Sequence, residues 1–251
     1  MKENMPGKQD IRATLYDQYV SRFKTAELHR DDRWFRAYWS WCEFKYLPPL
    51  SNIDRKEPVL ELGCGPGYVL EFLQRNGFTH AEGIDISREQ VGLARSRGLR
   101  ATAADCFAFL KKPRAYSAII AVDFVEHFTK EELLRLFPLI FKSLRPGGIL
   151  LLQTPNGQGL FPGQVVYGDL THQTIFAQDS LQHILTLAGF RNIRFAETGP
   201  VPDTFEGKLR TFLWSVIRGT IRIIRQIEAK NTSKLWTESI ICWCQKLPPS
   251  P

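Results

Sequence analysis

The sequence predicts an α/β protein with a mostly parallel sheet of seven strands and helices on both faces. Short apolar runs alternate with segments of helical periodicity through the middle of the chain, which is the pattern of a parallel sheet wound with helices. A glycine-rich turn follows the first of these runs. A chain of 251 residues with 43% hydrophobic composition can bury the core of one such domain.

The predicted elements follow in order along the chain. An aromatic-rich stretch at 10–46 is expected to form two helices that end at Pro48-Pro49 and lie over the open edge of the sheet. Residues 1–56 are therefore interpreted as a helical lid, and residues 57–251 as the main domain. Apolar or alternating runs predict strands at 58–62, 80–85, 100–104, 117–122, 147–153, 190–197 and 239–245, the last of them antiparallel. Periodicity predicts helices near 67–76, 88–97, 130–143 and 179–189, and an amphipathic helix inserted at about 206–230.

Charge and composition restrict the class of partner. The net charge is +7, but residues 57–200 are neutral, and the excess lies at the two ends, with eight basic and four acidic residues in 201–251. A nucleic-acid enzyme is expected to be basic near its active site, so no nucleic-acid partner is predicted. The chain shows neither a secretory signal nor an apolar stretch long enough to span a bilayer, which predicts a cytoplasmic protein. Its five cysteines suggest neither a disulfide framework nor structural zinc.

The stretch 59–68 (VLELGCGPGY) contains the main chemical signal. It joins an apolar strand to a helix through Gly63, Gly65 and Gly67, with Glu61 two residues before the first glycine. Glycine permits positive φ and lets a ligand approach the backbone. Tyr68 occupies the place of the third glycine of a dinucleotide fingerprint, so a pyrophosphate site is not indicated. About twenty residues later Asp85 ends a strand, where a carboxylate can accept both hydrogen bonds from a ribose diol.

This turn resembles motif I of the seven-stranded S-adenosylmethionine-dependent methyltransferases, and the run LRPGGILLL at 144–152 is similar to the turn and fifth strand of that family. The resemblance covers about residues 57–156 and implies a Rossmann-like fold with S-adenosylmethionine as the cofactor. It implies that the turn with Glu61 contacts the amino-acid end of the cofactor, that Asp85 binds its ribose, that Ile86 packs on the adenine beside Asp105 and Cys106, and that Asp123 lies under the sulfonium. Tyr16 and Tyr19 are expected to close over the cofactor, with a place in the core as the alternative.

Two groups are candidates for the chemistry of the acceptor. The loop YGDLTHQTIF at 167–176 resembles a stretch in bacterial methyltransferases of surface polysaccharide and lipid-linked saccharide synthesis, although the Arg-Pro-Phe-Thr-Pro of that family reads TIFAQ here. It predicts His172 as a general base oriented by Asp169, or else a histidine that only braces the loop. Asp123, Glu126 and His127 could hold a divalent ion, as in ubiquinone-pathway O-methyltransferases, but these residues merely shape the turn in metal-independent relatives, so no metal is predicted.

The leading hypothesis is O-methylation of a sugar hydroxyl in a glycan or lipid-linked saccharide. The alternatives are a small phenolic or quinone-precursor acceptor, and an inactive scaffold that binds S-adenosylmethionine. Residues 206–230 carry a charge of +4 and alternate basic with bulky apolar side chains, so this helix could lie on the anionic inner membrane. Packing on the domain itself or on a second subunit is the alternative, and the sequence does not indicate an oligomeric state.

Overall fold

The structure is a computed structural model that describes residues 30–112, 114–230 and 234–248. Its centre is a seven-stranded sheet with the strand order β3-β2-β1-β4-β5-β7-β6. Neighbouring strands from β3 to β5 are parallel, and β7 is antiparallel to both β5 and β6. The predicted Rossmann-like sheet with an antiparallel last strand is therefore confirmed. The strands are β1 (Val59–Leu62), β2 (Ala81–Asp85), β3 (Ala101–Ala103), β4 (Tyr116–Val122), β5 (Leu144–Pro155), β6 (Arg191–Glu197) and β7 (Ser239–Gln245).

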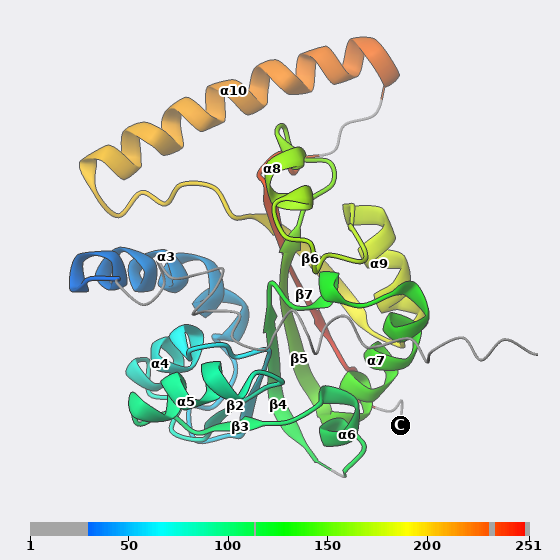
Figure 1. Cartoon of the computed structure of the whole chain (residues 1–251). Coiled ribbons are helices and arrows are strands. Elements are labelled where there is room, and N and C mark those ends of the chain that lie inside the picture. Colours follow the sequence, from blue (N-terminus) through cyan, green and yellow to red (C-terminus); the bar gives the residue numbers. More distant parts are fainter. Residues whose placement is uncertain (1–29, 113, 231–233, 249–251) are drawn as a thin grey trace, which may run out of the picture.

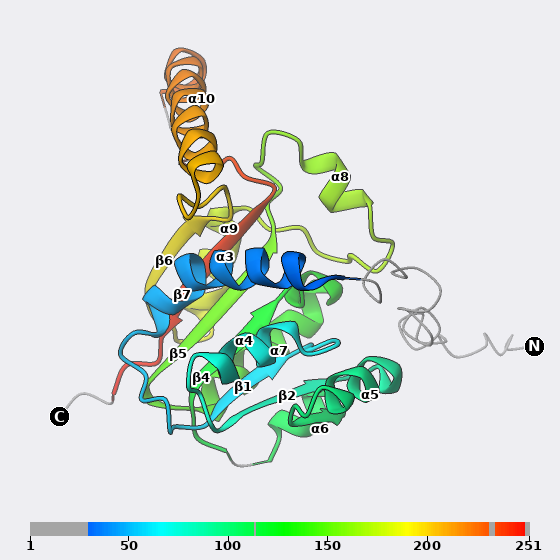
Figure 2. The ribbon, with the colours of Figure 1, turned by 90° about the vertical axis from the view of Figure 1, so that its left-hand side faces the viewer.

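Helices cover both faces of the sheet (Figures 1 and 2). They are α3 (Asp32–Leu50), α4 (Tyr68–Arg75), α5 (Arg88–Ser96), α6 (Cys106–Leu110), the 3-10 helix η2 (Val125–His127), α7 (Lys130–Ser143), α8 (Pro162–Tyr167), α9 (Gln178–Leu187) and α10 (Phe205–Ala229). Apolar side chains of α6, α7 and α9 pack on one face, and those of α3, α4 and α5 pack on the other. The short elements α6, η2 and α8 were not predicted, because one or two turns contain too little periodicity to recognise.

Helix α3 differs from the prediction in its end and in its position. It continues through Pro48 and Pro49 to Leu50, because Tyr46 and Leu50 are buried and hold the last turn in place despite the missing N–H groups. It lies on the face of the sheet rather than over an edge, and it shares a core with Leu151 of β5. The predicted lid residues Tyr16 and Tyr19 lie outside the described residues.

Helix α10 extends away from the sheet over the end where β6 stops (Figure 1). Gly207 is its only buried residue. Large apolar side chains on the helix are between 45% and 86% exposed: Phe205, Leu209, Phe212, Leu213, Val216, Ile217, Ile223, Ile224 and Ile227. Among the helices that the structure describes, none has the length and apolar character needed to cross a membrane.

Candidate active site

A cavity of about 260 Å³ lies at the carboxyl ends of β1, β2 and β4, and we call it the cofactor cavity. In parallel α/β sheets, ligands bind at this edge of the strands. Most of the residues predicted to bind the cofactor line it: Glu61, Gly63, Gly65, Asp85, Ile86, Asp105, Cys106 and Asp123. The structure therefore brings together side chains from four separate segments of the sequence.

The glycine-rich turn forms one wall of the cofactor cavity. Gly63 and Gly65 have φ of 69° and 51°, in the left-handed region that side chains disfavour. A Cβ at Gly63 would lie 2.5 Å from the ring of Phe124, and one at Gly65 would lie 2.8 Å from Oε1 of Gln90. The turn is thus closed to side chains and presents backbone to a ligand.

Gly67 was predicted to contact the cofactor, but it is not among the residues that line the cavity. It is the N-cap of α4, with φ of 87°. A Cβ there would collide with the side chain of Leu99 and come within 3.1 Å of Cβ of Ala94 in α5. Its role in the structure is therefore to allow α4 and α5 to pack closely behind the turn.

Two carboxylates lie behind the turn. Asp85 accepts hydrogen bonds from the backbone N–H groups of Gly65, at 2.9 Å, and Ser87, at 2.8 Å, so it also fixes the turn. Burial raises the pKa of Asp85 despite these bonds. Glu61 is only 2% exposed, and burial together with the charge of Asp85 raises its pKa well above the usual value.

Oε2 of Glu61 is buried and has no hydrogen-bond partner among the described residues. A buried carboxylate oxygen without a partner is costly, and Glu61 lines the cavity. A ligand ammonium would pair with it, so the donor set fits a molecule with an amino-acid end and a ribose. Residues and chemistry here agree with the predicted S-adenosylmethionine.

The remaining predicted cofactor residues are held by local contacts. The side chain of Asp105 accepts the N–H of Ala108 at 2.8 Å and so caps α6, while Cys106 begins that helix. Asp123 has φ of 48°, an uncommon value for a non-glycine residue, and its carboxylate accepts from Nε2 of Gln153 at 3.2 Å. Ile86 is 48% exposed at the cavity wall, as an apolar support for a ring requires.

A chain of hydrogen bonds joins the 167–176 loop to the cavity. The Thr171 hydroxyl lies 2.5 Å from Oδ1 of Asp169, to which it donates, and its oxygen lies 2.8 Å from Nδ1 of His127. Nε2 of His127 lies 3.2 Å from the carbonyl oxygen of Asp123. His127 lines the cofactor cavity, and burial together with the neighbouring His172 lowers its pKa to about 4. The ring is therefore neutral at neutral pH, and its low pKa makes it a weaker base than an ordinary histidine.

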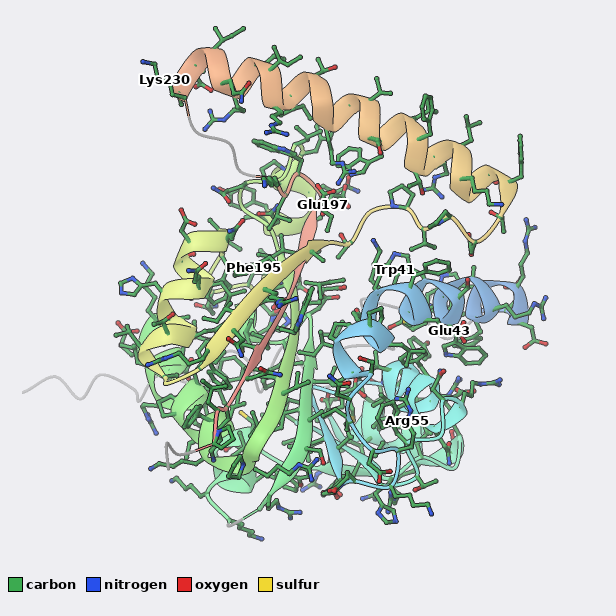
Figure 3. All side chains as sticks on the ribbon, turned by 180° about the vertical axis from the view of Figure 1, so that it is seen from behind. Trp41, Glu43, Arg55, Phe195, Glu197 and Lys230 are labelled. Carbon is green, nitrogen blue, oxygen red and sulfur yellow. The ribbon has the colours of Figure 1, made fainter. Side chains whose placement is uncertain are left out.

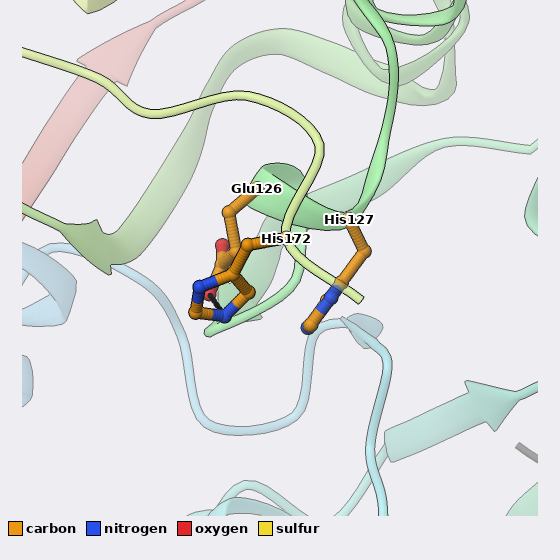
Figure 4. Close-up of side chains that lie close together, drawn as sticks. All are labelled: Glu126, His127 and His172. Atoms are coloured by element: carbon orange, nitrogen blue, oxygen red, sulfur yellow. Dashed lines mark ion pairs between the residues drawn. The ribbon is translucent and has the colours of Figure 1, made fainter. Parts of the chain in front are cut away.

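His172, the predicted base, lies beside His127 (Figure 4). The two ring centroids are 5.1 Å apart, but His172 is not among the lining residues of the cavity. Its Nδ1 lies 3.2 Å from the carbonyl oxygen of Val166, whereas the carboxylate of Asp169 accepts from Thr171. Nε2 of His172 lies 4.0 Å from Oε1 of the fully buried Glu126.

Ligand atoms of Glu126, His127 and His172 all lie within 4.8 Å of one another, so this cluster could hold a metal ion. The cluster differs from the set weighed on the sequence, because His172 takes the place of Asp123. The other side chain oxygen of Glu126 accepts from Thr154 at 3.1 Å, and burial raises the pKa of Glu126. A raised pKa favours the neutral carboxyl, so Glu126 does not require an ion beside it, and the absence of a metal stays a prediction.

A second cavity of about 670 Å³, which we call the outer cavity, lies on the other side of α3. Tyr38 lines the cofactor cavity, and Ala37 and Trp41 of the same helix line the outer one. Aromatic residues and charged groups share the lining of the outer cavity: Trp41, Phe161, Trp214 and Trp236 with Asp203 and Arg210.

The sequence prediction did not include Tyr38, and it considered His127 only as a metal ligand, whereas both residues line the cofactor cavity. Trp34 and Tyr38 stack with ring centroids 4.9 Å apart, and Tyr38 packs on Tyr68, directly after the glycine turn. Trp34, Tyr38 and Tyr46 are four and eight residues apart and so mark one face of a helix, and this signal could have placed Tyr38 toward the sheet.

The comparisons with known proteins agree with this architecture. A family model described as a methyltransferase domain matches residues 26–194. Ubiquinone biosynthesis O-methyltransferase of Xylella fastidiosa is 26% identical over 57% of this chain and 65% of its own length. Trans-aconitate 2-methyltransferase of Sinorhizobium medicae is 32% identical over 48% of this chain and 46% of its own length. The match thus spans less than two thirds of either relative.

Solved structures show the same fold. A SAM-dependent methyltransferase from Archaeoglobus fulgidus superposes with a TM-score of 0.63 and 21% identity, over 84% of this chain and 94% of that one. The magnesium protoporphyrin IX methyltransferase of Synechocystis with bound SAM superposes with a TM-score of 0.61 and 14% identity, over 96% and 100%. The family model covers more than half of the chain, and the sheet order and the cavity agree with it. The chain belongs to the methyltransferase domain family.

Proposed function

We propose that the chain transfers a methyl group from S-adenosylmethionine to a sugar hydroxyl of a glycan or lipid-linked saccharide. The observation that supports this acceptor best is the outer cavity, where indole and phenyl groups stand beside carboxylate and guanidinium groups. Apolar ring faces with a few convergent polar groups suit the C–H faces and hydroxyls of a sugar. The loop at 167–176, with its resemblance to saccharide methyltransferases, reaches the cofactor cavity through Thr171 and His127.

The cofactor would be held by groups already in place. Glu61 would pair with the ammonium group, the backbone of the glycine turn would contact the amino-acid end, and Asp85 would accept hydrogen bonds from the ribose. Ile86 and Cys106 offer apolar support, and Asp105 offers an acceptor for an amino group. S-adenosylmethionine supplies a methyl group that its sulfonium already activates, so the chain's own residues mainly position the acceptor and accept a proton.

His127 is better placed than His172 to accept that proton. If Thr171 donates its hydroxyl hydrogen to Asp169, its oxygen accepts from Nδ1–H of His127, and Nε2 of the neutral ring is then unprotonated and faces the carbonyl oxygen of Asp123. Once protonated, both ring nitrogens of His127 would face acceptors, namely Thr171 and the carbonyl of Asp123. Asp169 then acts through Thr171, and His172 braces the cluster from behind.

The acceptor class is tested by incubating the protein with S-adenosylmethionine and a panel of saccharides, with catechol and quinone precursors and trans-aconitate as comparators. We expect S-adenosylhomocysteine to form with a saccharide, and mass spectrometry to find the added methyl on a hydroxyl. Phe161, the N-cap of α8, is 75% exposed and lines the outer cavity, whereas Tyr167, the last residue of α8, is 82% exposed and does not. Phe161→Ala should raise KM for the saccharide and leave S-adenosylmethionine binding unchanged, and Tyr167→Ala is the matched control.

A second candidate acceptor is a small phenolic or quinone precursor, which the similarity to the Xylella fastidiosa ubiquinone biosynthesis O-methyltransferase favours. Turnover with phenols alone would select it and reject the saccharide. Binding of S-adenosylmethionine with no turnover on either class would favour the inactive scaffold. The proposal requires no metal, so dialysis against a chelator should leave turnover unchanged, and a loss that Mg²⁺ restores would contradict this part.

The proposed acceptor also suggests where in the cell the protein acts. A lipid-linked saccharide is met at the inner face of the membrane, so the proposal includes a cytoplasmic enzyme in peripheral contact with that surface.

A further inference from the structure

Helix α10 presents its apolar side outward. The less exposed positions, among them Trp214, Arg218, Ile221 and Arg225, recur at intervals of three and four and mark the side that faces the domain. Phe212, Val216, Ile223 and Ile227 lie on the opposite side and are 64%, 53%, 61% and 82% exposed. The outward stripe is thus apolar along the helix, although polar residues would be expected there in an ordinary surface helix.

The helix is fixed to the catalytic domain by Glu197, the last residue of β6 (Figure 3). Oε2 of Glu197 accepts from Nε1 of Trp214 at 3.0 Å and pairs with Arg218 at 2.9 Å. Its Oε1 accepts the N–H of Trp236 at 2.7 Å, after the end of α10. The carboxylate of Glu197, which is 9% exposed, thus binds both α10 and the segment that leads from α10 to β7. These contacts fix the orientation of α10 relative to the sheet.

The basic residues of α10 and its C-cap Lys230 differ in their surroundings, and Arg210 lines the outer cavity. Arg218 is neutralised by Glu197, and Arg225 pairs with Glu228 on the helix itself. Lys208, Arg222 and Lys230 are exposed, and they have no ion-pair partner among the described residues. They border an apolar stripe with positive charge, which is the pattern of a helix that lies on an anionic bilayer. A second copy of α10 would bring the same unpaired cations against one another, so the charges disfavour self-association.

The position of α10 relative to the active site also agrees with contact between this helix and a bilayer. Because β7 is antiparallel to both of its neighbours, β6 runs in the same direction as β1, β2 and β4. Glu197 and α10 therefore lie at the same edge of the sheet as the cofactor cavity, and the outer cavity includes Trp214 of α10. A surface bound by α10 would therefore lie beside the outer cavity, where the proposed acceptor binds.

We infer that the outward face of α10 is a docking surface for an anionic lipid bilayer, which brings the active site to an acceptor held in that bilayer. The choice of acceptor rests on the proposed function, whereas the docking surface does not. Apolar burial and the unpaired cations act together, and each basic residue near the surface changes binding by about fivefold.

The test is co-sedimentation of the full chain with vesicles of phosphatidylcholine alone or mixed with phosphatidylglycerol, without acceptor or S-adenosylmethionine. We expect binding to the anionic vesicles only, release by salt, and a loss of at least tenfold in Ile223→Ser/Ile227→Ser. Leu134→Ser/Leu187→Ser is the matched control, since these leucines of α7 and α9 are also exposed, at 56% and 67%. Lys208→Gln/Arg222→Gln should weaken binding about twentyfold or more at low salt.

Three results would overturn the inference. Equal loss in the control pair would mean that the apolar stripe has no special role. Wild-type binding that ignores lipid charge would mean that the cations do not select an anionic bilayer. A wild-type dimer in light scattering that Ile223→Ser/Ile227→Ser converts to a monomer, with no vesicle binding, would assign the face to a second copy. Calorimetry with S-adenosylmethionine, together with turnover on a soluble saccharide, tests the proposed function separately, so either idea can fail alone.

Discussion

Gly67 offers a test of why the cofactor turn has its shape. Its φ of 87° places it in the left-handed region, and a Cβ there would meet Leu99 and Ala94. For Gly67→Ala, the left-handed conformation costs about 1–2 kcal/mol, and overpacking adds about 1–3 kcal/mol. We therefore expect the free energy of unfolding to fall by about 2–5 kcal/mol, a large share of the stability of a typical domain.

Two other glycines separate these contributions. Gly98 also has a positive φ, of 77°, but nothing lies within 4 Å of a Cβ placed there. Gly98→Ala should then cost only about 1–2 kcal/mol. Gly92 lies inside α5 with equally open space, so Gly92→Ala should stabilise by about 0.5–1 kcal/mol.

Equilibrium unfolding in urea measures all three variants, with circular dichroism as the probe. The reasoning would be refuted by a Gly67→Ala variant that loses no more stability than Gly98→Ala, since the contact with α5 would then be irrelevant. Because Gly67 does not line the cavity, the folded Gly67→Ala protein should also bind S-adenosylmethionine more tightly than Gly65→Ala does.

Three further outcomes are expected. Asp85→Ala should weaken S-adenosylmethionine binding in calorimetry by about 1–3 kcal/mol, and tight binding of NAD by the wild type would reject the cofactor assignment. His127→Ala should slow turnover by about 10²–10⁴-fold at unchanged cofactor affinity, with a smaller effect for His172→Ala; the reverse ranking would return the role of base to His172. Because the folded state raises the pKa of Glu61, the ligand-free protein should lose stability as pH rises from the usual glutamate value through that raised pKa. Glu61→Gln should flatten this dependence in urea titrations at several pH values, and an unchanged slope would show that Glu61 does not cause it.

Elements whose signals are local could be predicted well from the sequence. Helix α7 begins at Lys130, as predicted, because Thr129 and Glu132 form a capping box, a motif that can be recognised in the sequence. The positions of the glycine turn and of the Asp85 carboxylate were predicted correctly, because each lies at the end of a strand that the sequence predicts. The residues of the cofactor cavity follow from these two strand ends, so most of that site was accessible without a structure.

Features that depend on distant contacts were not accessible in this way. The apolar pattern of α10 predicts an amphipathic helix, but it does not state which side faces the domain. Arg218 binds Glu197, 21 residues earlier, and faces inward, which the charge pattern of 206–230 does not indicate. The contacts of Arg218 and Trp214 with Glu197 leave the apolar side of the helix facing outward.

The acceptor side of the site also depends on contacts that the sequence does not reveal, even between residues that are neighbours in the chain. Glu126 and His127 are neighbours in the sequence, yet Glu126 is fully buried against Thr154 and His127 lines the cavity, because η2 turns successive side chains in different directions. The partner of His127 is Thr171, 44 residues away. The loop that contains His172 therefore contacts His127 through the Thr171 hydroxyl, which Asp169 holds, and a catalytic role for His172 and Asp169 stays a prediction.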